Sequence, residues 1–248
     1  MTAATVSAQA RDTDVSAFEV RSLTAGYGRT TVLREVSFAI PTGSVVALLG
    51  ANGAGKTTLL RTAAGLLEPT QGNVILNGSE VSGLPPNRRA RAGLCLIPEG
   101  RGIFRELTVR ENLRLLRPAW VRTDRTDLVL QQFPVLGRRL RQTAGSMSGG
   151  EQQMLALARA FLCEPEVVMI DEASMGLSPI AVEQIFGALK ALAETGVSLL
   201  LVEQYVEKAL EMADLVVLID SGTITFAGPT AEVDHDSLLR SYLGRDVE

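Results

Sequence analysis

The segment GANGAGKT (residues 50–57) brings together glycines, a lysine and a threonine in a spacing that suits phosphate binding. Glycines let successive backbone N–H groups turn inward around phosphate oxygens, and a helix that follows adds positive potential at its N-terminus. We expect Lys56 to bring a cation to the outer phosphates and the Thr57 hydroxyl to ligate Mg²⁺. A flexible glycine-rich turn is the alternative, but a predicted buried strand (44–50) precedes the loop and a helix-like segment (55–67) follows it. The loop therefore predicts a nucleoside triphosphate site without deciding the reaction.

Two acidic residues, Asp171 and Glu172, end the apolar run VVMIDE (167–172). At the end of a strand, Asp171 could hold Mg²⁺ through water, and Glu172 could polarise the water that attacks a phosphate. Acid–base help of this kind is worth about 10²–10⁴-fold in rate. Two acids after a strand are often only a helix cap. The phosphate loop earlier in the same chain favours the catalytic interpretation.

A third segment, MSGGEQQ (147–153), begins a predicted amphipathic helix. Ser148 and Glu151 have the S-x-x-E spacing of a capping box. Capping alone does not call for Gly149 and Gly150, each of which weakens the first turn by about 1 kcal/mol relative to alanine. Both glycines are explained if the backbone must approach something closely. A bare helix N-terminus with a serine is an anion site, and we expect it to suit a γ-phosphate.

The segment LLLVEQYVEKAL (199–210) changes from a buried strand to a helix at Glu203 and Gln204. Ligand contacts in α/β sheets gather at the carboxyl ends of strands. We therefore expect the Gln204 amide to donate to the γ-phosphate. A helix cap is the alternative, although glutamine is a poor N-cap. A histidine is not available for this strand end, because His235 is the only histidine in the chain.

Strand-like and helix-like segments alternate from residue 44 onward, which predicts an α/β protein with a mostly parallel sheet. Before that point, residues 17–23 and 30–40 alternate in the manner of half-buried antiparallel strands. Residues 101–163 are rich in arginine and leucine and helical in character. A hairpin is predicted around residues 220–222.

The composition describes a globular protein of 248 residues with a net charge of −4 and a pI of about 5.3, so no nucleic-acid footprint is expected. Arginines cluster at 88–91 and at 138–141, and we interpret both clusters as solvated faces. No apolar run approaches the roughly 20 residues needed to span a bilayer. The small and polar residues 1–17 predict a disordered tail.

Taken in this order and spacing, GANGAGKTT, SMSGGEQQ and VVMIDEAS resemble the nucleotide-binding subunit of ABC transporters. The segments LIPEGRGIFRELTVRENL (96–113) and LLVEQYVEKAL (200–210) resemble more narrowly the smaller ATP-binding protein of high-affinity branched-chain amino acid importers. The resemblance covers about residues 18–244. It implies a P-loop (RecA-like) core sheet, an N-terminal antiparallel β subdomain and an inserted helical subdomain. On this basis residues 18–98 and 164–248 form the core with its β subdomain, and residues 99–163 form the helical subdomain.

The resemblance also assigns roles to individual residues. Tyr27, in GYG, matches the aromatic residue that stacks on adenine, with a core tyrosine as the alternative. Glu172 and Gln204 are the implied catalytic residues, and Thr57, Glu99 and Asp171 are the implied Mg²⁺ ligands. The implied nucleotide-binding residues are Tyr27, Gly50, Asn52, Gly53, Gly55, Lys56, Thr57, Thr58, Ser148, Gly149, Gly150 and Glu151.

Several positions depart from the usual pattern of ABC ATPases. Glu99 replaces the usual glutamine and Gln204 the usual histidine, and both changes resemble the amino-acid-importer branch. Ala173 stands where proline is usual after the catalytic glutamate, and nothing in the sequence explains it. Ser178 stands where aspartate is usual.

The function implied is that of an ATPase, with ATP and Mg²⁺ as cofactors, that drives uptake of branched-chain or related hydrophobic amino acids. The implied partners are a second ATP-binding subunit in a homo- or heterodimer, two transmembrane permease subunits and an extracytoplasmic substrate-binding protein. The subunit would lie peripherally on the cytoplasmic face of the inner membrane.

An importer of urea, amides or another small metabolite is the alternative within the class. A soluble ABC ATPase of DNA repair or translation is a second class, which the single cassette and the acidic pI disfavour. A P-loop kinase or GTPase is a third, which the lack of an N-K-x-D guanine-binding motif disfavours.

Overall fold

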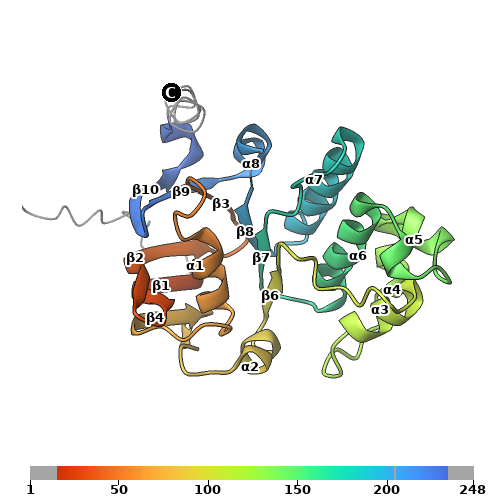
Figure 1. Cartoon of the computed structure of the whole chain (residues 1–248), viewed down its shortest axis with the longest axis horizontal. Helices are drawn as coiled ribbons and strands as arrows, with labels where there is room; N and C mark the ends of the chain where they lie inside the picture. The colour runs from red at the N-terminus through yellow and green to blue at the C-terminus, as the bar shows by residue number, and fades with distance from the viewer. Residues whose placement is uncertain (1–15, 204, 234–248) are drawn as a thin grey trace, which may run out of the picture.

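Two β-sheets of different kinds form the core of the protein (Figure 1). The computed structural model describes residues 16–203 and 205–233. The first sheet is antiparallel, with the order β2-β1-β4-β5. Its strands are β1 (Ser16–Tyr27), β2 (Thr30–Pro41), β4 (Gln71–Leu76) and β5 (Ser79–Glu80). This sheet confirms the predicted antiparallel β subdomain.

The second sheet has the order β10-β9-β3-β8-β7-β6 and is parallel except for its edge strand β10. Its strands are β3 (Val45–Leu49), β6 (Leu94–Ile97), β7 (Val167–Asp171), β8 (Ser198–Val202), β9 (Leu215–Asp220) and β10 (Thr223–Pro229). Every residue of β3, β7 and β8 is buried, as expected for central parallel strands covered on both faces. The predicted α/β class, the mostly parallel sheet and the hairpin at residues 220–222 are confirmed.

Helix α1 (Lys56–Ala63) lies between the two sheets and shares one apolar cluster with both. Leu59, Leu60 and Ala63 on this helix are fully buried. They pack in the cluster that also contains Phe18 of β1 and Leu48 of β3. The first turn of α1, which carries the phosphate-loop lysine, is therefore fixed by core packing on two sides.

A helical part stands on the other side of the parallel sheet and appears at the right of Figure 1. Its longest helix is α6, which packs against α3, α4, α5 and α7 and against strand β6. An edge-to-face contact between Phe133 and Phe161, with ring centroids 5.7 Å apart, helps to hold α6 to the segment between α4 and α5. The helices of this part are α3 (Val109–Leu116), α4 (Thr126–Gln132), α5 (Pro134–Arg138) and α6 (Gly149–Leu162).

The remaining helices flank the parallel sheet. They are α2 (Pro86–Arg91), α7 (Pro179–Ala193) and α8 (Val206–Met212), with short 3₁₀ turns η1 (Ala144–Ser146) and η2 (Thr230–Glu232). Within the described ranges 16–203 and 205–233, no helix is both long enough and apolar enough to cross a membrane.

The predicted N-terminal tail is two residues too long, because β1 begins at Ser16. Ala17 is buried and its carbonyl accepts a hydrogen bond from the Asn77 amide. Ser16 and Ala17 therefore belong to strand β1 of the antiparallel sheet and not to a tail. The alternation that predicts β1 therefore extends further toward the N-terminus than the polar composition suggests. The other residues of the predicted tail lie outside the described part of the chain.

The interpretation of the first arginine cluster as a solvated face is wrong for Arg89, which is only 2% exposed. Its guanidinium donates to the carbonyls of Thr62 and Ala63 (2.8 Å each), Leu84 (2.9 Å) and Ser82 (2.5 Å). Two of these carbonyls end helix α1, where backbone acceptors lack helical partners and a positive charge is favourable. Arg89 thus ties the end of α1 to the loop that follows β5.

We expect Arg89→Ala to lower the free energy of unfolding by about 3 kcal/mol or more, because it leaves buried carbonyls without donors. Arg88→Ala is the matched control, since Arg88 is exposed in the same helix and should change stability by less than about 0.5 kcal/mol. Denaturant unfolding of both variants measures the difference. Equal midpoints for the two variants would contradict the buried role of Arg89.

Candidate active site

Three adjacent strands bring the phosphate loop, the Asp171–Glu172 pair and Glu203 to the same end of the parallel sheet. Strand β8 lies between β3 and β7, and all three run in the same direction. The phosphate loop follows β3, Asp171 ends β7, and Glu203 follows β8. Carboxyl ends of parallel strands are the usual place for ligand contacts in α/β proteins.

The phosphate loop wraps around the Lys56 side chain, which is 9% exposed. The Lys56 ammonium donates to the carbonyls of Gly50 (2.6 Å) and Ala51 (3.1 Å). Burial lowers the pKa of Lys56, while the carboxylates of Glu172 and Asp171 oppose that shift. An ammonium has three donors, so one stays available for an anion at the mouth of the loop.

The loop passes into α1 through Gly55, whose φ of +109° disfavours any side chain. A Cβ at this position would also lie 2.9 Å from Leu33 Cδ2 of the antiparallel sheet. Thr58 is buried in the first turn of the helix, whereas Asn52 and Gly53 form the exposed tip of the loop. The loop is therefore pressed against the first sheet while its tip faces solvent.

The Thr57 hydroxyl donates to Asp171 Oδ1 at 3.2 Å, which joins the phosphate loop to the end of β7. Burial raises the pKa of Asp171 to about 6; the Thr57 hydrogen bond opposes this, and the nearby Glu172 and Glu99 carboxylates add to it. In the described residues no group of three or more His, Cys, Asp or Glu could hold a metal by itself. Thr57, Asp171 and Glu99 supply the hard oxygen atoms that suit Mg²⁺, which commonly takes its remaining ligands from water and substrate phosphates.

Glu172 follows β7 with a φ of +50°, a left-handed conformation that costs a residue with a side chain roughly 1–2 kcal/mol. Its amide donates to the carbonyl of Val202 at 2.8 Å, so the turn is tied to the end of β8. Backbone strain of this kind is often found at functional sites. The strained turn lifts the chain away from β7 directly after Asp171.

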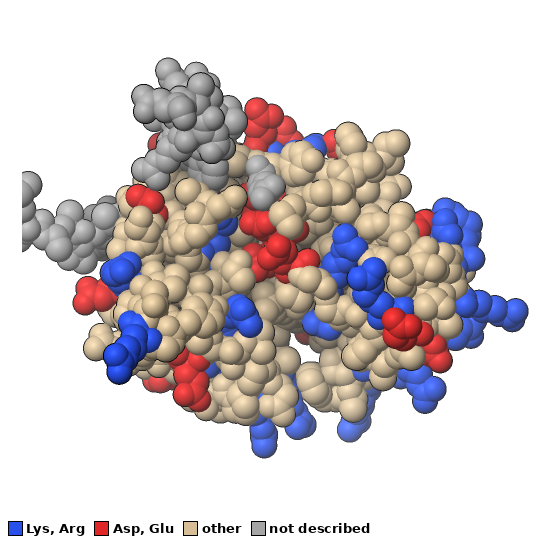
Figure 2. Space-filling view, viewed as in Figure 1, with Lys and Arg blue, Asp and Glu red and all other residues tan. Residues whose placement is uncertain are grey.

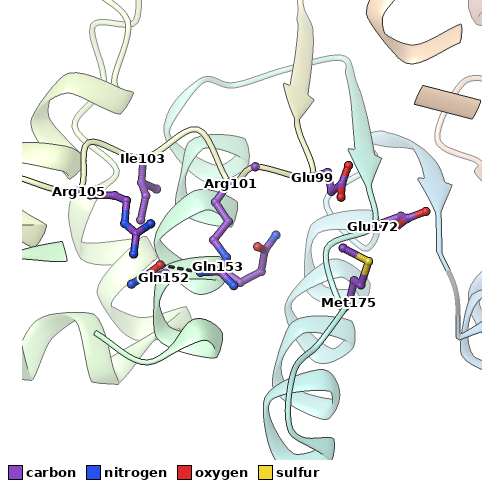
Figure 3. Close-up of a pocket in the computed structure, with 9 residues that line it drawn as sticks. Glu99, Arg101, Ile103, Arg105, Gln152, Gln153, Glu172 and Met175 are labelled. Carbon is purple, nitrogen blue, oxygen red and sulfur yellow. Dashed lines mark hydrogen bonds between the residues drawn. The ribbon is translucent and has the colours of Figure 1, made fainter. Parts of the chain in front are cut away.

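Glu172 lines a pocket together with Glu99, Arg101, Arg105 and Gln153 (Figure 3). The two carboxylates stand at one side of the pocket and the arginines at the other, where Arg101 Nη1 donates to Gln152 Oε1 at 2.6 Å. Figure 2 shows acidic side chains gathered in the middle of this face, between the two parts of the molecule, with basic side chains on both sides.

Ser148 caps helix α6 in the predicted capping box. Its Oγ accepts from the Glu151 amide at 3.3 Å, and Glu151 Oε2 accepts from the Ser148 amide at 3.0 Å. Glu151 also pairs with Arg139 at 2.8 Å. One residue of the second arginine cluster is thus engaged in an ion pair rather than only solvated.

The two glycines of α6 have different surroundings. A Cβ on Gly150 would lie 2.7 Å from the Cβ of Ala181 in α7, so contact between helices of the same chain already requires glycine there. A Cβ on Gly149 would meet side-chain atoms alone, with Arg101 Nη2 at 3.2 Å and Leu177 Cδ2 at an ordinary contact distance of 3.5 Å. Intrachain packing therefore accounts for Gly150, and close approach of a ligand remains the explanation only for Gly149.

Tyr27 is 45% exposed at the end of β1, so it is not a core tyrosine. Its exposure leaves the ring accessible, and the stacking on adenine that the resemblance implies stays a prediction. Gln204 lies outside the described residues, so its predicted phosphate contact stays a prediction. His235 lies outside them as well.

The structure adds a buried acid that the sequence analysis did not single out. Glu203 is 3% exposed, and its Oε2 accepts a hydrogen bond from the Ser174 hydroxyl. Burial raises the pKa of Glu203 to about 7, although hydrogen bonds from Ser174 and from the Ala173 backbone lower it. The abrupt end of the apolar run at Glu203 was the available signal, but the chemistry expected there was assigned to Gln204.

Comparison with known proteins settles the family. The family model described as "ABC transporter" matches residues 33–175, which is more than half of the chain. The chain belongs to the ABC transporter family. It is accordingly an ATP-binding and ATP-hydrolysing subunit, and the resemblance on which the sequence analysis relied is confirmed.

Several relatives of this ABC ATPase span nearly its whole length. The chain is 40% identical over 225 residues to the high-affinity branched-chain amino acid transport ATP-binding protein BraG of Pseudomonas aeruginosa, covering 88% of this chain and 95% of the relative. It is 38% identical over 227 residues to the probable branched-chain amino acid transport ATP-binding protein LivF of Archaeoglobus fulgidus, covering 90% and 96%. It is 33% identical over 234 residues to the lipopolysaccharide export system ATP-binding protein LptB of Acidithiobacillus ferridurans, covering 91% and 96%.

Among solved structures, an ATP-binding subunit of an ABC transporter is 30% identical, with a TM-score of 0.81. The match covers 91% of this chain and 99% of that structure. The shared fold supports the predicted combination of an antiparallel sheet, a mostly parallel sheet and helices.

The variants Gly149→Ala and Gly150→Ala distinguish a glycine needed for ligand contact from a glycine needed for helix packing. Gly150→Ala should lower the free energy of unfolding by about 1–3 kcal/mol, because its Cβ overpacks against Ala181. Gly149→Ala should leave stability unchanged or slightly higher, since alanine favours a helix, yet it should reduce ATP turnover. Thermal unfolding and phosphate release measured on both variants test this. Parental turnover in Gly149→Ala would remove the case for a phosphate contact there.

We also expect the buried Glu203 carboxyl to make stability depend on pH. Its pKa is 4.5 as the ordinary value and about 7 in the fold, so the folded chain binds more protons between these values. Stability from this group is complete below pH 4.5 and is lost as pH rises through about 7, by at most about 3 kcal/mol. Asp171 adds a change of the same sign up to about pH 6.

Denaturant unfolding at pH 5 and pH 8 measures this dependence in the parent and in Glu203→Gln. The variant should gain stability relative to the parent at pH 8, because glutamine has no charge to bury. The same stability difference between variant and parent at both pH values would show that Glu203 is not the titrating group.

Proposed function

We propose that this ABC ATPase drives an importer of branched-chain or related hydrophobic amino acids. The observation that carries the proposal is the 40% identity to a branched-chain amino acid transport protein over nearly the full length of both chains. The 38% identity to a second protein of the same description supports it. The proposed partners are a second ATP-binding subunit, two transmembrane permeases and an extracytoplasmic binding protein, with the subunit at the cytoplasmic face of the inner membrane.

The proposed hydrolysis assigns each group at the sheet edge a task. Lys56 and the loop amides hold the outer phosphates, and Tyr27 stacks on the base. Thr57, Asp171 and Glu99 hold Mg²⁺, which when bound neutralises charge on the phosphates. Glu172 accepts a proton from the attacking water and orients it.

The position of Ser148 supports a nucleotide shared between two subunits. Helix α6 and helix α1 stand apart, on opposite sides of β7 in Figure 1. The proposed anion site at Ser148 therefore faces a phosphate other than the one held by the Lys56 loop of its own chain. A second copy, or a related subunit, supplies that nucleotide in the proposed dimer.

An apolar groove between the core and the helical part suits the proposed permease contact. It is lined by residues that include Leu66, Phe104, Leu115 and Trp120, which are 55%, 52%, 55% and 41% exposed. Large exposed apolar side chains gathered in one groove mark an interaction surface. A cytoplasmic helix of a permease is the proposed occupant, because the groove also adjoins the segment that carries Glu99.

Lipopolysaccharide export is the second candidate function, on the observation of 33% identity to LptB over 234 residues. The two candidates differ in the direction of transport and in the cargo. Neither cargo contacts the ATPase in the proposed arrangement, so transport itself must be measured.

The proposal predicts transport from purified parts. Proteoliposomes that contain the ATPase and its permeases, with the binding protein and ATP supplied, should accumulate radiolabelled leucine, and unlabelled isoleucine or valine should compete. Uptake of urea in place of leucine would favour the other importer class, and ATP-driven release of lipopolysaccharide would favour export.

Phe104→Glu should abolish leucine uptake while the isolated ATPase still binds ATP, because it places a charge in the apolar groove.

Glu172→Gln tests the hydrolytic role. We expect the variant to bind Mg-ATP but to lose turnover by about 10²-fold or more, and to collect as an ATP-bound dimer in light scattering. Glu194→Gln, an exposed substitution of the same chemistry at the end of α7, is the control. Near-parental hydrolysis by Glu172→Gln would sink the assignment.

A further inference from the structure

One buried side chain, that of Glu203, holds the turn formed by residues 172–174. Glu172 has a φ of +50°, and such a conformation persists only when its surroundings enforce it. The Glu172 amide is fixed by the Val202 carbonyl at 2.8 Å. Glu203, the residue that follows Val202 and the end of β8, contacts the rest of the turn.

Within residues 16–203 and 205–233, the Glu203 carboxylate is held by this turn. Oε2 accepts from the hydroxyl of Ser174, a fully buried residue, and the neighbouring backbone of Ala173 and Ser174 lowers the pKa of the carboxyl. Oε1 has no well-aligned donor in the described part of the chain. Successive amides that converge on an anion form a small nest, here occupied by an internal carboxylate.

This arrangement gives a physical account of Ala173. Proline has no backbone N–H, so a proline at 173 would remove one of the donors that face Glu203. Alanine keeps that donor and is small enough for a site that is 2% exposed. The replacement of the usual proline therefore fits the buried acid beneath it.

The contacts of Glu203 are not those of a residue that mainly stabilises the fold. The Glu172 carboxylate, which is of the same sign, raises the pKa of Glu203 further, and among the described residues no cation opposes this shift. A buried carboxylate without a cation weakens a fold, so its retention here calls for another role.

We propose that Glu203 is a positioning residue for Glu172: its carboxylate holds residues 173 and 174 so that the strained turn presents the Glu172 carboxylate to the phosphate site. The inference rests on the proposed role of Glu172 in hydrolysis. Glu203 itself is buried beneath the turn and does not touch the nucleotide.

Glu203→Gln tests the proposal, since glutamine keeps the shape but turns an NH₂ group toward backbone donors. The kcat for ATP hydrolysis should fall about 10-fold or more, while KM for ATP stays within about twofold and the melting temperature at pH 8 does not fall. Ser174→Ala should lower kcat in the same way by a smaller factor, and Ser174→Thr, which restores the hydroxyl, should recover part of it. Glu207→Gln, an exposed glutamate four positions along, should match the parent.

Coupling to Glu172 decides the matter. In a Glu172→Gln background, adding Glu203→Gln should cause no further loss of the residual rate, because both changes remove the same contribution. A multiplicative loss, or a parental kcat in both Glu203→Gln and Ser174→Ala, overturns the inference while leaving the proposed function intact. Parental hydrolysis by Glu172→Gln itself would instead overturn the role of Glu172, and the positioning role with it.

Discussion

Three short strands with every side chain buried determine where the chemical groups of this protein lie. Strands β3, β8 and β7 are five residues long each and pair in parallel, so their carboxyl ends meet at one edge. Because burial on both faces fixes the register, the phosphate loop, Glu203 and the Asp171–Glu172 pair have little freedom to move relative to one another. The loops add chemistry to a geometry that the strands have already imposed.

Local patterns in the sequence were sufficient for the parts of the site that depend on neighbouring residues. The phosphate loop, the Ser148 capping box and the acidic end of β7 each carry their own signal within a few positions. The family resemblance added that these three motifs, which are far apart in the sequence, belong to one kind of nucleotide site. No local pattern contains that information. Arg89 was misjudged because a run of arginines gives no indication that one of them turns inward onto carbonyls 26 and 27 positions away. The pair formed by Ser174 and Glu203 is separated by 29 positions and is visible only in three dimensions.

Burial at the carboxyl ends of the strands costs stability at the place where the proposed chemistry occurs. It raises the pKa of both Asp171 and Glu203, because their charged carboxylates would be better solvated in water. The left-handed turn at Glu172 adds backbone strain at the same place. Natural proteins tolerate such unfavourable features mainly where function requires them. The tightly packed cores on either side, with α1 locked by Arg89, offset this local weakness.

The distance between helices α1 and α6 within one chain has a kinetic consequence (Figure 1). If Lys56 and Ser148 must contact the same nucleotide, hydrolysis in dilute solution is second order in protein, and activity per chain falls as the protein is diluted. A membrane complex that carries two such subunits replaces free encounter by a fixed effective concentration, of millimolar order for short connections. Attachment to that complex would then accelerate the enzyme without any change to its catalytic groups, simply by removing the cost of finding a partner.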